Sequence, residues 1–144
     1  AAPFAAALAV RLSDGNTSVR LSAAASLTLM GEAGAAAFAA RLDDAEAFVR
    51  RAAVQGLGQL GPVAIPYVET LALQLGDVDS AVRESIVSTL GCLGKPASLA
   101  LEELLYSGTP CLRRRAAETL AVLGCAERSS KAALARGMKD SDAL

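Results

Sequence analysis

Histidine and tryptophan are absent from this chain of 144 residues, and aromatic residues make up only 3% of it. Histidine is the commonest general base and a frequent metal ligand, so its absence removes the usual centre of hydrolytic and zinc sites. The sequence also lacks an apolar run of the roughly 20 residues that cross a bilayer. We therefore expect no metal, no cofactor and no membrane span.

The chain also has almost no net charge, because 14 basic residues nearly balance 15 acidic ones. The chain has no global field to attract nucleic acid or an anionic membrane, and we do not expect nucleic acid as its main partner. Its three cysteines, Cys92, Cys111 and Cys125, are odd in number and show no metal-ligand spacing. We interpret them as buried or half-buried free thiols. They indicate an intracellular, reducing compartment, the cytoplasm or an organelle interior, and not secretion.

The chain does contain a sequence fragment that returns four times. An apolar residue followed by arginine recurs at Val19, Val49, Val82 and Leu112, with spacings of 30, 33 and 30 residues. A glycine stands twelve residues after each apolar start, and a fifth copy begins at Asp140. Self-similarity at this period is the signature of a repeat solenoid.

Each repeat reads as two helices. In the third repeat, Pro66 suits the first position of a helix, and Pro3 and Pro96 hold the same place in other copies. A second helix is expected from about Ser80 to Leu93, with Asp79 as its N-cap and the closing glycine ending it. Asn16, Glu46, Thr109 and Asp142 are the equivalent cap positions, and Glu46 is a poor choice among them. The second helices keep apolar residues in five equivalent slots, one of which holds Leu27, Leu57, Leu90 and Leu120.

These patterns predict an all-α fold, a right-handed α-α superhelix of about four helix pairs plus a partial fifth. We expect a single domain over 1–144, with repeats at about 3–31, 34–61, 66–94 and 96–124 and a partial repeat at 129–144. Leu57 and Leu90 should be almost fully buried. Neither end shows the polar outer face of a capping repeat, so we expect a partner or further polypeptide to cover at least one end.

Three segments resemble the HEAT-repeat family, in the short form found in phycobilisome lyase-like proteins: DGNTSVRLSAAASLTLMG, DDAEAFVRRAAVQGLGQLG and DVDSAVRESIVSTLGCLG. The resemblance implies a ladder between neighbouring repeats, formed by a turn aspartate and the arginine six residues later. The matching positions are Asp14 and Arg20, Asp44 and Arg50, and Asp77 and Arg83. Ser107 before Arg113 departs from the pattern, so we expect the ladder to be weakened or rewired there.

No group of residues makes a convincing active site. Glu102 and Glu103 are neighbours on a helix, so their side chains diverge by about 100°. The glycines at 56, 58 and 61 imitate a dinucleotide fingerprint but lie at the end of a helix instead of its start. The arginines at 113–115 are the one notable basic cluster, and without interleaved aromatics they are better explained as a solvated face.

The outward slots of the second helices carry small or polar residues, a surface suited to protein contact. The slots expected to face outward include those of Gly56, Thr89 and Thr119. The possible partner surface comprises Arg51, Gln55, Ser88, Arg114, Arg115 and Glu118. We therefore favour a non-catalytic scaffold or adaptor that docks on a larger protein assembly. Two alternatives stay open: a chromophore (bilin) lyase-like enzyme or its accessory subunit, by fold analogy alone, and a nucleic-acid-binding solenoid that uses the arginine cluster.

Overall fold

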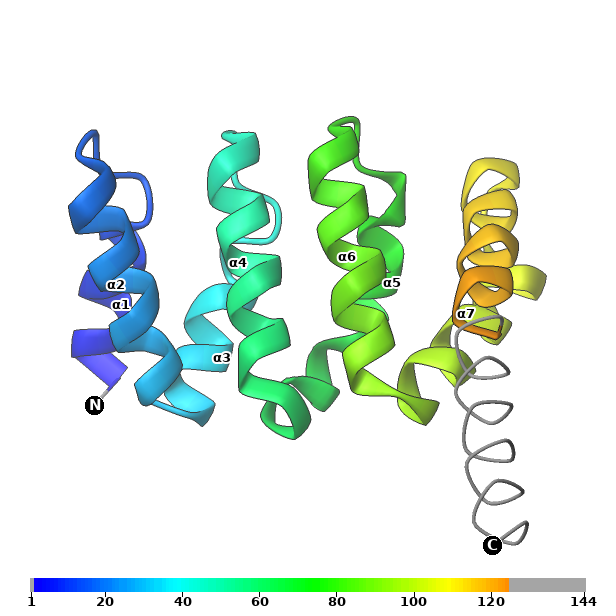
Figure 1. Cartoon of the computed structure of the whole chain (residues 1–144), viewed down its shortest axis with the longest axis horizontal. Helices are drawn as coiled ribbons and strands as arrows, with labels where there is room; N and C mark the ends of the chain where they lie inside the picture. Colours follow the sequence, from blue (N-terminus) through cyan, green and yellow to red (C-terminus); the bar gives the residue numbers. More distant parts are fainter. Residues whose placement is uncertain (1, 125–144) are drawn as a thin grey trace, which may run out of the picture.

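The computed structural model describes residues 2–124, and these form four consecutive helix pairs (Figure 1). The first helices of the pairs are α1 (Ala2–Arg11), α3 (Glu32–Ala39), α5 (Val68–Leu73) and α7 (Lys95–Ser107). The second helices are α2 (Thr17–Leu29), α4 (Ala47–Leu60), α6 (Ser80–Leu93) and a helix over 110–124. The predicted all-α solenoid is confirmed. The predicted partial fifth repeat and the cap Asp142 lie outside the described residues.

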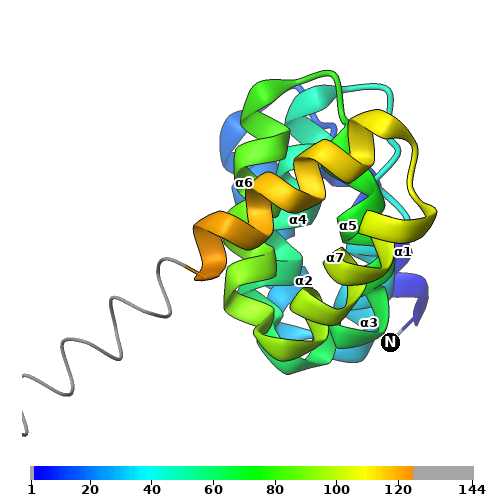
Figure 2. The ribbon, with the colours of Figure 1, turned by 90° about the vertical axis from the view of Figure 1, so that its right-hand side faces the viewer.

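The helices form two layers, as the end-on view shows (Figure 2). First helices make up one layer, and α2, α4 and α6 make up the other. The array therefore presents two long faces to solvent, a first-helix face and a second-helix face.

None of the helices in residues 2–124 has the length and apolarity needed to cross a membrane.

The core between the layers is aliphatic and continuous along the array. Leu57 and Leu90 are completely buried, as predicted, and so is Leu27 in the equivalent slot of α2. The slot that opens each second helix is less uniform. Val49 and Val82 are 0% and 1% exposed, whereas Val19 is 37% exposed because no described helix pair packs against that side of α2.

The helix starts follow the predicted capping. Asn16 accepts hydrogen bonds from the N–H groups of Ser18 and Val19 at 2.9 and 3.3 Å. Asp79 accepts from Val82 at 3.1 Å, and the Thr109 hydroxyl accepts from Leu112 at 3.4 Å. Glu46 makes no such bond, because its longer side chain does not hold a carboxylate at the distance that a short cap residue does.

Three of the closing glycines are required by backbone conformation alone. Gly31, Gly61 and Gly94 have φ values of 58°, 60° and 71°, a region that residues with a Cβ rarely adopt. A Cβ built on any of the three would meet no atom within 4 Å. These glycines therefore reverse the chain between helix pairs and leave the packing untouched.

The third repeat departs from the prediction at its first helix. A 3-10 helix, η1 (Gly61–Tyr67), precedes α5, and a second one, η2 (Gln74–Gly76), follows it. The α-helix begins at Val68, not at Pro66. Pro62 and Pro66 both lack the N–H that an α-helical turn uses, so the chain takes the tighter 3-10 form through them.

Two glycines of α4 make room for neighbouring side chains. A Cβ on Gly56 would lie 2.3 Å from Cζ of the buried Phe38 ring, and one on Gly58 would lie 2.9 Å from Oγ1 of Thr89. Thr89 in turn donates to the carbonyl oxygen of Val54 at 3.2 Å, which ties α6 to α4. The expected outward orientation of Gly56, Thr89 and Thr119 is thus wrong. All three are buried, because adjacent second helices pack more closely along this row than the pattern indicated.

We expect Leu90→Ala to lower the free energy of unfolding by roughly 2–5 kcal/mol, because the substitution leaves a cavity in the core. Leu29→Ala is the matched control, since Leu29 is 89% exposed and its truncation should change stability by less than about 0.5 kcal/mol. Urea unfolding followed by circular dichroism measures both. Equal losses in the two variants would contradict the observed register of the second helices.

Gly56→Ala should destabilise the protein by about 1–3 kcal/mol, because the Phe38 ring is buried and must move off its site. Gly91→Ala in α6 is the control. Gly91 is exposed, and its added Cβ would lie 3.1 Å from Cδ2 of Leu123. That atom is the end of a flexible side chain that can move aside, so the gain in helix propensity of about 1 kcal/mol should dominate there. Thermal unfolding of both variants distinguishes the cases, and stabilisation by Gly56→Ala would refute the role given to the glycine.

Candidate partner-binding surface

An arginine holds the turn of each repeat to its second helix. The Nη1 groups of Arg20, Arg50 and Arg83 donate to the backbone oxygens of Asp14, Asp44 and Asp77 at 2.7, 2.8 and 2.6 Å. In the fourth repeat Arg113 donates to the carbonyl oxygen of Gly108 at 3.0 Å. Within a repeat, the arginine thus bonds the aspartate's carbonyl, not its carboxylate.

Among the ion pairs of residues 2–124, the one that joins two repeats is formed by Arg50 and Asp77. Nε and Nη2 of Arg50 donate to the two carboxylate oxygens at 2.8 and 3.1 Å. The side chains are only 12% and 4% exposed, so the two-point contact is shielded from water. Bidentate pairs of this kind are stronger than single charged hydrogen bonds.

The expected rung between Arg20 and Asp44 is replaced by other contacts. The Arg20 guanidinium lies over the Phe48 ring, 5.1 Å from its centroid, a cation–π arrangement. The Asp44 carboxylate accepts from the Glu46 N–H at 3.0 Å and pairs with Arg41 at 3.6 Å. This part of the predicted ladder is wrong, because the Arg20 guanidinium packs on Phe48 and the Asp44 carboxylate is bound by Arg41 and the Glu46 N–H.

Asp77 is held in its charged form. Burial by itself would raise the pKa of Asp77, but hydrogen bonds from the Arg50 guanidinium and the Asp79 N–H outweigh it and leave the pKa below its ordinary value. The bond to Asp77 likewise raises the pKa of Arg50. A depressed carboxyl pKa means that the pair stabilises the fold at neutral pH, and that this stabilisation is lost as the pH falls through the folded-state pKa.

The fourth repeat has a turn one residue shorter than the third. α7 includes Ser107, and Gly108 takes the extended conformation that Asp77 has in the preceding repeat. The residue that accepts the arginine's Nη1 bond is therefore Gly108, not Ser107 as counting along the sequence suggests. A Cβ at Gly108 would lie 2.6 Å from the carbonyl oxygen of Leu104, so no aspartate fits there.

Three grooves lie along the second-helix face, one between each pair of neighbouring second helices. The α2/α4 groove encloses about 350 Å³, the α4/α6 groove about 630 Å³, and the groove between α6 and the 110–124 helix about 190 Å³. Gln55 and Gln59 line both of the first two. The two grooves therefore adjoin along α4, and we call them together the furrow.

The residues of the predicted partner surface divide between two grooves. Arg51, Gln55 and Ser88 line the α4/α6 groove together, and all three are exposed. Arg115 and Glu118 line the groove at the 110–124 helix. Arg114 is exposed beside it, with Nε 3.9 Å from the Glu118 carboxylate.

The sequence reasoning missed the apolar end of this furrow. Leu21 and Phe48 line the α2/α4 groove and are 67% and 44% exposed. The signal was present, since Leu21 holds the slot that Arg51, Glu84 and Arg114 hold in the other repeats. An exposed leucine in a slot that is otherwise charged indicates a contact surface.

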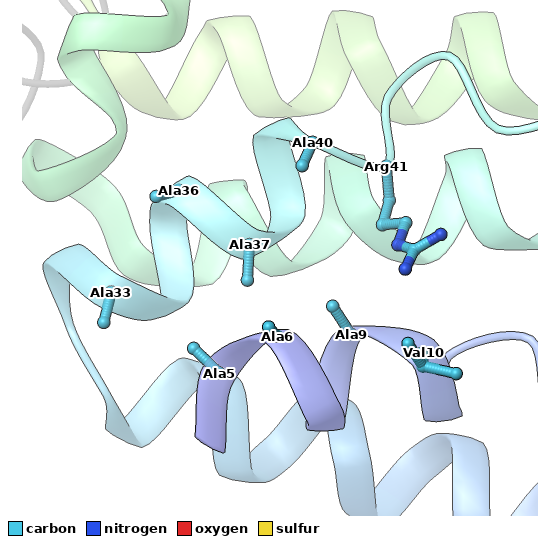
Figure 3. Close-up of a pocket in the computed structure, with 9 residues that line it drawn as sticks. All are labelled: Ala5, Ala6, Ala9, Val10, Ala33, Ala36, Ala37, Ala40 and Arg41. Carbon is cyan, nitrogen blue, oxygen red and sulfur yellow. The ribbon is translucent and has the colours of Figure 1, made fainter. Parts of the chain in front are cut away.

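A separate groove of about 550 Å³ lies on the first-helix face, between α1 and α3 (Figure 3). Alanines of the two helices line it, with Val10 on its rim and Arg41 at one end. The short side chains leave the space between the helices open. Phe4 and Val10 of α1 are 73% and 50% exposed, as the apolar composition of this segment suggested.

The cysteine prediction needs correction. Cys92 and Cys111 are free, but both are exposed instead of buried. Cys92 lies in the outward row of α6 that also holds Ser88, and Cys111 lies in the first turn of the last helix, where little packs against it. Cys125 is outside the described residues.

Comparison with known proteins agrees with this architecture. The sequence profile of the HEAT repeats matches residues 36–121, which is more than half of the chain. The chain belongs to the HEAT-repeat family. HEAT repeats generally serve as protein-interaction scaffolds.

A solved structure described as an engineered protein is similar to this HEAT-repeat chain, with a TM-score of 0.50 and 19% identity. The alignment covers 84% of this chain and 62% of the engineered one, and at that identity it supports the fold alone. No curated protein sequence matches the chain. The shorter, phycobilisome lyase-like subtype stays a prediction.

Asp77→Asn should lower stability at neutral pH by about 3 kcal/mol, because Arg50 then stays buried without its counter-charge. The difference from wild type should shrink as the pH falls below about 4, where the unfolded carboxylate becomes protonated, and should vanish below the depressed pKa of the folded Asp77. Urea unfolding at a series of pH values measures this.

Asp14→Asn is the matched control for that series. Among residues 2–124, the Asp14 carboxylate forms an ion pair only with Arg11, at 3.5 Å, and the Arg11 side chain is 61% exposed. Both substitutions keep an oxygen that can accept the backbone N–H two residues on. The control should cost at most about 1 kcal/mol; equal costs would mean that the bidentate pair adds no special stability.

Proposed function

We propose that this chain is a non-catalytic protein-interaction scaffold, which binds its partner along the second-helix face and docks on a larger protein assembly. The observation that carries the proposal is the furrow of two adjoining grooves across α2, α4 and α6, which share Gln55 and Gln59 on α4. A furrow that crosses three helices suits a long polypeptide segment better than a small molecule, which favours one enclosed pocket.

The chemistry of the furrow supports a protein partner. Its α2/α4 end offers the exposed apolar side chains of Leu21 and Phe48, and its α4/α6 end offers Arg51 and Glu84, of opposite charge. An apolar anchor next to polar and charged groups is the usual composition of a protein interface. Mixed charge also argues against a polyanion, which would meet Glu84 as well as Arg51.

Apart from Glu84, the α6 side of the furrow has short side chains. Ala81, Ser85 and Ser88 line its α6 side, so a partner's backbone can approach the helix closely. Few long side chains must be immobilised there on binding, which lowers the entropic cost of association. We infer that the partner lies along this floor, with its apolar residues toward Phe48.

The proposal predicts that charge placed in the furrow abolishes partner binding. The full chain is used as bait in cell extract, and the retained proteins are identified by mass spectrometry. A Gln55→Arg and Ser88→Arg double variant should retain the partner at least about tenfold less than wild type, because unmatched charges in an interface are costly. The affinity of the identified partner is then measured with purified proteins.

A Thr70→Arg and Leu99→Arg double variant is the matched control. It adds the same charge to exposed positions of α5 and α7, on the first-helix face, and should bind as wild type does. Thermal unfolding verifies that both variants fold. Equal losses in the two variants, or the absence of any protein whose retention depends on the furrow, would contradict the proposal.

A further inference from the structure

The groove between α6 and the 110–124 helix is lined by two arginines and by Glu118, whose carboxylate makes an ion pair with Arg114 and with neither of the two arginines. Arg83 and Arg115 both line it. Within residues 2–124, neither arginine has a carboxylate oxygen within 4.0 Å, since the ion pairs there involve Arg11, Arg41, Arg50 and Arg114. Arg115 is also the residue whose Nε is buried and has no hydrogen-bond partner among the described residues.

The equivalent slots elsewhere show how unusual this arrangement is. Arg83 holds the slot of Arg50, whose fork binds Asp77 at two points. Arg83 keeps the bond to its own turn, through Nη1 to the Asp77 carbonyl oxygen. Its remaining N–H groups face a repeat whose shorter turn ends at Gly108, where a side chain would collide with Leu104. The chain itself therefore cannot supply this carboxylate from that turn.

Arg115 adds a second guanidinium where the other repeats have short side chains. Its slot holds Ala52 in α4 and Ser85 in α6. A buried Nε without a partner is costly, and two like charges in one groove repel each other. Such an arrangement is relieved by an anion that enters the groove.

We infer that this groove is a binding site for a carboxylate side chain of a partner protein. The inference rests on the proposed scaffold function and names the chemistry of one contact. The carboxylate takes the place that Asp77 takes on Arg50, and the Arg115 guanidinium donates to it as well, after a turn of its side chain that exposes the buried Nε. Val87 and Val122 line the same groove, so an aspartate or glutamate with its apolar methylene groups fits the site.

The size and surroundings favour a carboxylate over a nucleic-acid backbone. The groove holds about 190 Å³, space for one side chain and not for a phosphodiester strand. Glu118 lies on its rim, 64% exposed and 3.9 Å from Arg114, which would repel a polyanion more than a single acid. The preceding repeat provides the pattern for the site, since Nε and Nη2 of Arg50 already bind the Asp77 carboxylate.

The experiment uses the full 144-residue chain and observes the arginine Nε–Hε signals by ¹H–¹⁵N NMR. The probe is glutamate capped as N-acetyl and N-methylamide, with capped glutamine as the neutral control and inorganic phosphate as the alternative anion. Capped glutamate should shift the Arg83 and Arg115 signals in a saturable way, and capped glutamine should not. Phosphate acting alone would overturn the inference in favour of a phosphate site.

Variants separate a specific site from general attraction to positive charge. Arg115→Ser copies the residue of the preceding repeat and should weaken capped-glutamate binding about tenfold, the effect of losing one charged hydrogen bond. Arg114→Ser removes the same charge one residue away and should change binding by less than about twofold. Equal losses in the two variants would overturn the inference.

Glu118→Gln gives a readout of opposite sign. Removal of the acid on the rim should strengthen capped-glutamate binding, because the incoming carboxylate no longer meets a like charge. If instead the Arg115 Nε–Hε signal moves in the free Glu118→Gln variant to the same extent as on titration, Glu118 itself fills the site and the inference fails.

The partner identified through the furrow provides the last comparison. Arg115→Ser should weaken its binding, and Arg114→Ser should not. Partner binding that is sensitive to Gln55→Arg and Ser88→Arg but unaffected by Arg115→Ser would leave the scaffold function standing and reject the carboxylate site. The two proposals can therefore fail separately.

Discussion

The hydrogen bond from an arginine guanidinium to the carbonyl oxygen of the preceding turn is the interaction on which the rest of this array depends. All four described repeats make it, although the turns differ in length and in the residue that accepts the bond. It fixes where each second helix starts relative to its first helix. Three of these arginines also face the next repeat: Arg20 lies over the Phe48 ring, Arg50 pairs with the Asp77 carboxylate, and Arg83 lines a groove together with Arg115.

The stacking of the pairs could be predicted from the sequence because it depends on periodicity. Leu57 and Leu90 recur in equivalent slots and are fully buried, and the caps Asn16 and Asp79 act at the expected positions. These features follow from local rules that recur in most copies. Residues that obey the same rule in four places leave little freedom in the pairing of helices.

The details of the surface could not be predicted in this way, because they depend on how closely particular helices approach each other. Gly56 appeared to face outward, but the Phe38 ring lies against it. The ladder appeared to repeat along the array, but Asp44 is engaged by Arg41 and by the Glu46 N–H. The missing aspartate was placed at Ser107 by counting, whereas the shorter turn places it at Gly108. Each error concerns one side chain and one neighbour, for which a repeat pattern carries no information.

The alanine-lined groove between α1 and α3 has a mechanical consequence. Among the labelled helices, α4 and α6 make the most extensive contact, with Thr89 bonded across it, so that junction resists bending. Between α1 and α3 the short side chains leave open space on the first-helix face (Figure 3). This open space leaves room for a tilt of the first repeat toward that face. Such a tilt would widen the α2/α4 groove, in which Leu21 and Phe48 lie. The distance between these two apolar side chains could then adjust to a partner while the α4/α6 junction keeps its geometry.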